Sequence, residues 1–90
     1  MGLFLNEYKV QGTEPAADGS TTVTITFADE GIGTFASANE YDVDIIRGSV
    51  AVDTKGATTL VLLNTGAYTT TDGIYEVRIR PRNLPVKKTV

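Results

Sequence analysis

The sequence predicts a small all-β domain, either an antiparallel β-sandwich or a barrel of six to eight short strands, with an immunoglobulin-like or jelly-roll-like arrangement. Apolar and polar residues alternate with a period of two in several segments. Turn residues separate these segments at intervals of about ten residues, and no segment has a sustained helical period. We therefore expect one β domain over residues 1–90, with extended arms at residues 1–10 and 81–90.

The first half of the chain contains one ambiguous segment and one clear strand. Residues 3–10 place Phe4 and Tyr8 four apart, which fits a helix, but the same residues also fit a strand, and we favour the strand. Residues 21–27 alternate strictly, with Val23, Ile25 and Phe27 on one face and threonines on the other. This pattern is typical of a half-buried strand. Residues 29–33 then predict a turn.

A change in apolar register marks the middle of the chain. Residues 41–45 are apolar at the odd positions, whereas the apolar residues from Ile46 to Val52 occupy even positions. A bulge or tight turn at Arg47–Gly48 would accommodate this change. The run from Thr54 to Ala57 predicts a hairpin turn.

The remaining strands differ in the surroundings that they predict. Residues 59–63 are apolar on both faces, which predicts a strand at the centre of a sheet or at an interface. Residues 75–80 alternate, with Tyr75, Val77 and Ile79 expected to point inward. We expect Pro81 and Pro85 to restrict the end of the chain to an edge strand or an extended arm.

Composition excludes several classes of function. The chain has no cysteine and no histidine, so disulfide frameworks, zinc sites and hydrolytic triads are ruled out. We therefore expect a protein that is not an enzyme and carries no cofactor and no metal. The densest apolar run, residues 60–63, is too short to cross a membrane, and residues 1–6 are too short and uncharged for a signal peptide. We expect a protein made and used in a cytoplasm, or in a particle assembled there.

Basic residues concentrate near the end of an otherwise acidic chain. Five of the eight fall within the last thirteen residues, and Arg78, Arg80 and Arg82 alternate along one predicted strand face. Three interpretations remain open for this ridge. It can pair within the chain, for instance with Glu76 or Asp42, it can contact the acidic strand of a neighbouring copy, or it can bind nucleic-acid phosphates. The net charge of −3 makes nucleic acid the least favoured partner.

Three further groups of residues are candidates for function. Glu40, Asp42 and Asp44 would share one strand face and could offer oxygen ligands to Ca²⁺, but no turn glycine interrupts the run, so we favour a solvated face. Tyr68, in the loop from Gly66 to Gly73, is the tyrosine expected to be exposed for contact. Near the start, three consecutive apolar residues could anchor a partner: Leu3, Phe4 and Leu5.

Taken together, the alternating threonines of residues 21–27, the absence of Cys and His, the Thr- and Gly-rich loop at 66–73 and the arm-like ends resemble the decoration or cement proteins of tailed-phage capsids. This resemblance implies a homo-oligomeric structural protein of the virion that bridges capsid subunits and is assembled in the host cytoplasm. Its protein partner would then be contacted by the apolar residues 3–5 and steered by the arginine ridge.

A second, local resemblance favours a different class of protein. Residues 72–80 are similar to the late tyrosine-containing strand of immunoglobulin and fibronectin type III domains, although the chain has neither their tryptophan nor a cysteine pair. It implies an adhesion or tail-fibre module that recognises a host glycan or protein through the Tyr68 loop.

Overall fold

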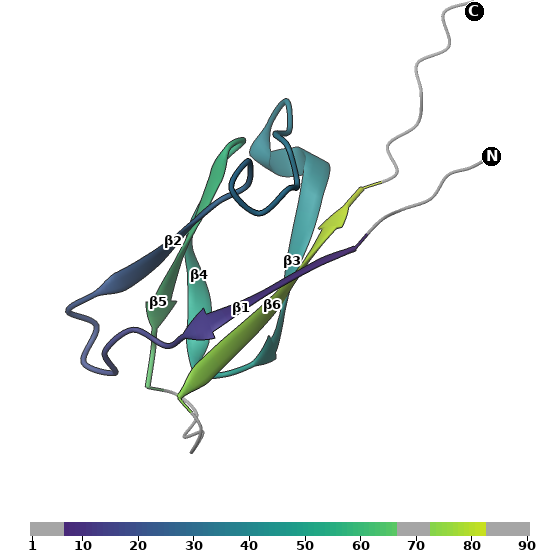
Figure 1. Ribbon diagram of the computed structural model, residues 1–90. Helices are drawn as coiled ribbons and strands as arrows, with labels where there is room; N and C mark the ends of the chain where they lie inside the picture. Colours follow the sequence, from purple (N-terminus) through teal and green to yellow (C-terminus); the bar gives the residue numbers. More distant parts are fainter. Residues whose placement is uncertain (1–6, 67–72, 83–90) are drawn as a thin grey trace, which may run out of the picture.

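The computed structural model describes residues 7–66 and 73–82, which form two three-stranded antiparallel sheets (Figure 1). The first sheet has the strand order β1–β6–β3, and the second has the order β2–β5–β4. This arrangement confirms the predicted all-β fold. The strands are β1 (Tyr8–Thr13), β2 (Thr22–Thr26), β3 (Tyr41–Arg47), β4 (Val50–Lys55), β5 (Thr59–Asn64) and β6 (Ile74–Pro81), and a short 3-10 helix, η1 (Ala38–Glu40), precedes β3.

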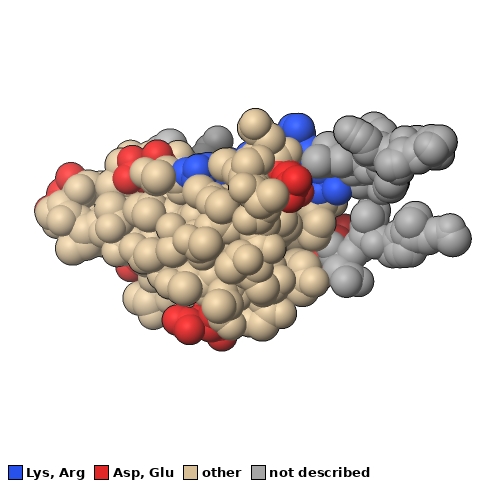
Figure 2. Space-filling view, turned by 90° about the horizontal axis from the view of Figure 1, so that it is seen from above, with Lys and Arg blue, Asp and Glu red and all other residues tan. Residues whose placement is uncertain are grey.

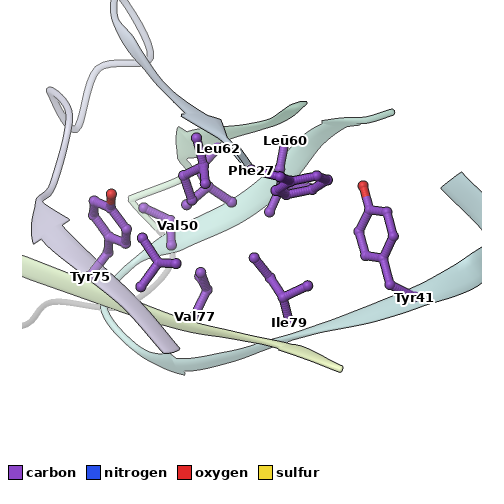
Figure 3. Close-up of a cluster of buried hydrophobic side chains, with 10 residues drawn as sticks. Phe27, Tyr41, Val50, Leu60, Leu62, Tyr75, Val77 and Ile79 are labelled. Carbon is purple, nitrogen blue, oxygen red and sulfur yellow. The ribbon is translucent and has the colours of Figure 1, made fainter. Parts of the chain in front are cut away.

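Both sheets contribute side chains to one hydrophobic core. Figure 3 shows Leu60 and Leu62 of β5 facing Val77 and Ile79 of β6, so the apolar faces of the central strands of the two sheets meet. The alternation predicted for β6 is confirmed, because Tyr75, Val77 and Ile79 are buried. Removing each of these large side chains from water contributes about 1.5–3 kcal/mol. The buried apolar residues are Val10, Ile25, Phe27, Tyr41, Val50, Leu60, Leu62, Tyr75, Val77 and Ile79.

An aromatic cluster closes one end of this core. The Phe27 ring meets the Phe35 and Tyr41 rings edge to face, at centroid distances of 5.4 and 5.2 Å. The Tyr41 hydroxyl donates a hydrogen bond of 2.6 Å to the Gly56 carbonyl oxygen. Burial raises the pKa of the Tyr41 phenol above its ordinary value, so this hydroxyl keeps its proton and remains a donor. Tyr41 thereby links β3 of the first sheet to the β4–β5 hairpin of the second.

The chain passes from the first sheet to the second at a corner between β3 and β4. The pairing of β3 with β6 shifts register between Ile45 and Arg47. Gly48 then adopts a φ of +102°, and Ser49 is buried. The predicted bulge or tight turn at Arg47–Gly48 is confirmed. The apolar positions change from odd to even because the chain there leaves one sheet for the other, whose inner face lies on the opposite side.

Two other expectations are confirmed by the second sheet. The apolar segment that was expected to be central forms β5, which lies between β2 and β4. The hairpin predicted at Thr54–Ala57 joins β4 to β5; Thr54 and Lys55 belong to β4, and the turn at residues 56–58 is closed by a hydrogen bond of 3.0 Å from the Gly56 N–H to the Thr59 carbonyl.

One expectation needs correction. Glu40 does not share a strand face with Asp42, because it belongs to η1. Strand β6 is the central strand of the first sheet, and Pro81 is its final residue, opposite Tyr41. A proline is tolerated there because the strand ends at that position. Of the expected arms, residues 8–10 and 81 lie in strands, and Glu7 and Arg82 are described but belong to no strand. Residues 1–6 and 83–90 lie outside the described residues.

We predict that Gly48→Ala destabilises the fold by about 3 kcal/mol. A Cβ at Gly48 would lie 2.9 Å from the Tyr75 Cα and 3.0 Å from the Ile74 carbonyl oxygen, in addition to the strain of a positive φ. Gly33→Ala is the matched control, because Gly33 also has a positive φ (+87°) but has open space around it, so we expect a cost of about 1 kcal/mol. Urea denaturation measures the loss of unfolding free energy for both variants. Equal losses would contradict the close approach of Gly48 to β6.

Candidate protein-interaction surfaces

The outer face of the first sheet carries charged residues from all three strands. Because alternate residues of β6 point into the core, Glu76, Arg78 and Arg80 lie on the opposite face. The antiparallel register places Asp42 of β3 opposite Arg80 and Asp44 opposite Arg78. Opposite charges therefore face each other across neighbouring strands.

These residues form an ion-pair ladder made of Glu7, Asp42, Asp44, Arg78, Arg80 and Arg82. The Arg80 Nε donates to the Asp44 Oδ2 at 2.6 Å, and the Arg78 Nη2 lies 3.1 Å from the same oxygen. At the end of β6, the Arg82 Nη2 donates to the Asp42 Oδ1 at 3.0 Å. Arg78 also approaches Glu7, with 3.6 Å between Nη1 and Oε1. The three arginines thus have carboxylate partners within the chain.

The ladder changes the proton affinity of its members. A hydrogen bond from Arg82 holds the pKa of Asp42 below its ordinary value, and a hydrogen bond from Arg80 does the same for Asp44. The same contacts raise the pKa values of Arg80 and Arg82. Side chains of the ladder are between 34% and 48% exposed, so water screens each pair and each contributes little to stability.

Of the three interpretations of the arginine ridge, pairing within the chain describes the contacts in the structure. Asp42 is one of the partners that the sequence predicted, whereas Glu76 is not among the ion pairs of the described residues. The pairing leaves less unbalanced positive charge for phosphates. Contact with a neighbouring copy stays a prediction.

The three carboxylates proposed as calcium ligands do not converge. Asp42 and Asp44 bind arginines, and the Glu40 Oε1 accepts a hydrogen bond of 3.1 Å from the Ala36 N–H. Within residues 7–66 and 73–82, no three His, Cys, Asp or Glu residues form a group that could hold a metal ion.

The β3–β4 corner exposes a group of aliphatic side chains that sequence reasoning missed. Ile45, Ile46 and Val52, which we name the corner surface, are 38%, 44% and 38% exposed. Ile45 continues the apolar alternation of Tyr41 and Val43. It is exposed because β3 and β4 are edge strands of different sheets, so no other strand of the described residues covers this side. The change in apolar positions at Arg47–Gly48 was the signal in the sequence from which the corner surface could have been predicted. Figure 2 shows the molecule from above the view of Figure 1, from the side opposite this corner; most of that face carries no charged atoms.

A polar network fixes both ends of the loop that contains Tyr68. Buried Asn64 donates from Nδ2 to the Pro15 carbonyl at 2.9 Å, and its Oδ1 accepts from the Gly66 N–H at 2.9 Å. The Glu14 N–H donates to the Gly73 carbonyl at 2.8 Å. This end of the domain lies away from the end where β1 begins and β6 finishes (Figure 1). Four predicted contact residues lie outside the described residues: Leu3, Phe4, Leu5 and Tyr68.

Comparison of the chain with protein-family models, with curated proteins and with solved structures found no match. Among the residues that the structure describes, no helix is long and apolar enough to cross a membrane.

We predict that the ladder makes stability depend on pH. Asp42 and Asp44 have lower pKa values in the folded chain than the ordinary 3.8, so their stabilisation is present above that value and is lost as the pH falls below it. The double variant D42N/D44N should be less stable than the wild type at neutral pH, and the difference should shrink between about pH 4 and pH 2. Thermal unfolding across this range measures it.

Asp53→Asn is the control, because Asp53 is exposed on β4 and forms no ion pair among the described residues. The difference in thermal stability from the wild type should shrink on acidification for D42N/D44N but not for D53N. If it shrinks equally for both variants, the ladder has no specific role in the pH dependence.

Proposed function

We propose that this protein is a non-enzymatic structural protein of a virion, a decoration or cement protein that stabilises the capsid shell by bridging capsid subunits. The observation that carries the proposal is the corner surface. Ile45, Ile46 and Val52 are the exposed large aliphatic side chains of the described residues, and they present apolar area to solvent at an edge of the domain. An exposed apolar group with a polar surround is typical of a protein-binding surface.

The mechanism would be additive burial of surface. A contact that covers about 800 Å² on each partner is of standard size for a specific complex. Repeated over a symmetric shell, many such contacts resist expansion of the shell without one strong bond. Covering the corner surface would contribute about 25 cal/mol for each Å² of apolar area removed from water.

The ion-pair ladder supports a second role in the same proposal. Its three arginines and three carboxylates balance one another, so the face is polar without a large net charge. A face of this kind suits the rim of an interface, where exposed charges contribute to orientation and partner choice more than to affinity. In this role the arginines still help to orient the protein on its partner, and they do so together with the carboxylates that they bind.

The anchored loop favours one alternative function, an adhesion or tail-fibre module. Asn64 and Glu14 fix the two described ends of the loop, Gly66 and Gly73, as a rigid scaffold would fix a recognition loop. Copy number separates the alternatives. A cement protein would be present in tens to hundreds of copies in a particle, and a tail module in few.

We predict that the variant I46S/V52T lowers affinity for assembled shells by about tenfold, equivalent to about 1.4 kcal/mol, because both changes reduce apolar area on the corner surface. Sedimentation of the purified protein with shells measures occupancy. Val61→Thr is the matched control, since Val61 lies on the outer face of β5, the opposite face of the second sheet from Leu62 and its partner Val52. Equal occupancy for wild type and I46S/V52T would remove the corner surface from the proposal.

We predict a separate effect for the exchanged pair D42R/R82D. The exchange keeps an internal ion pair between these positions but reverses the local charge pattern. If the ladder orients the protein on the shell, shell binding at low salt should fall several-fold while thermal stability changes little. Unchanged binding at both low and raised salt would exclude the ladder from the contact.

A further inference from the structure

Strand β2 offers an open edge for pairing. It lies at the end of the second sheet and pairs with β5. One residue beyond the strand, the Phe27 N–H donates to the Thr58 carbonyl at 3.0 Å. Because hydrogen-bonded pairs alternate along an antiparallel ladder, Val23 and Ile25 also bond to β5. The N–H and C=O groups of Thr22 and Thr24 and the N–H of Thr26 therefore point to the open side, while the Thr26 carbonyl accepts a hydrogen bond of 3.0 Å from the Asp29 N–H.

This edge lacks the features that usually prevent pairing with another chain. Residues 19–28 contain no charged residue and no proline, and β2 pairs with β5 without a register shift. The edge strands on the other side of the domain, β3 and β4, each contain a register shift. Bulges and charges are the common means of protecting an edge strand. Edge strand β1 carries Lys9, next to Arg78 of the ladder.

The sequence of β2 is complementary to itself. Antiparallel pairing about a two-fold axis at Thr24 places Thr22 opposite Thr26 of the second copy, and Thr24 opposite its own counterpart. The same register sets Val23 against Ile25 of the second copy on the inner face. Cross-strand pairs of threonines and of β-branched apolar residues are favourable. Val23 is only partly buried although it packs against the core, so a second copy would cover more of it.

We propose that two copies of this chain associate through their β2 edges into a symmetric dimer. The two second sheets would then form one six-stranded antiparallel sheet with the order β4–β5–β2–β2–β5–β4. Its outermost strands would be the two copies of β4, whose register shift between Val52 and Thr54 disfavours further pairing. Assembly by this edge therefore stops at two copies. The association needs no shell and does not depend on the proposed virion role, and it leaves the corner surface open on each copy.

Charge at position 24 provides the test, because the two-fold axis places this residue opposite itself. Thr24 is exposed, so Thr24→Lys and Thr24→Glu should both fold. At low salt each variant alone should form a dimer about fivefold weaker than the wild type, since like charges would face each other. An equimolar mixture should recover at least the wild-type affinity through a mixed dimer. Sedimentation equilibrium measures all three.

Thr24→Pro tests the backbone pairing itself. It removes an N–H that faces the open side, so the dimer should be lost while the folded monomer is retained. Gln11→Pro is the matched control: the Glu14 N–H bonds to Gly73, and by the same alternation the Gln11 N–H faces the open side of β1. Thr54→Lys, on β4, is the control for added charge. Both controls should remain dimeric.

Three results would overturn the proposal. They are a wild-type protein that is monomeric at about 100 µM, a Thr24→Pro variant that folds and remains dimeric, and a mixture of the Lys and Glu variants that associates no better than either variant alone.

Discussion

The structure depends on one corner, at which the chain leaves the first sheet and enters the second. Ser49 is buried there, its N–H donates to the Glu14 carboxylate, and its carbonyl accepts from the Thr65 N–H at 2.9 Å. These bonds join the corner to the β1–β2 connection and to the end of β5. Gly48 allows the approach, because a Cβ would meet Tyr75 of β6. Every strand of both sheets thus has a described link to this corner, either directly or through a paired neighbour.

The corner also explains how the surfaces are distributed. Placing β3 and β4 in different sheets makes both of them edge strands on the same side, and their inner-facing aliphatic residues are left partly uncovered. On the outer face of the first sheet, the register of β3 with β6 sets Asp42 and Asp44 among the arginines and balances their charge. The chain therefore presents a neutralised charged face, an apolar corner and a threonine-lined edge at β2. The first two carry the proposed function, and the third carries the proposed dimer.

Local pattern in the sequence was sufficient to locate most of the strands, but it was not sufficient to predict which strands pair with each other. Alternation over residues 21–27 identified strand β2, and the change in apolar positions from odd to even identified the corner at Gly48. Strand order depends on contacts between distant segments, so the central position of β6 could not be predicted from Pro81 alone. The same limit applied to the ladder. The pairing of an arginine with Asp42 was among the interpretations, but the shared use of Asp44 by two arginines follows from register, and the exposure of Ile45 follows from its place at an edge.

The account requires that the protein acts through surface shared with other molecules. Hydrogen–deuterium exchange of the purified chain, free and bound to assembled capsid shells, tests this requirement most directly. The account predicts that amides of residues 45–53 become protected on binding, while amides in the outer part of the β1–β2 connection keep their rate. Exchange that is identical in the two states, together with no sedimentation on shells, would contradict it.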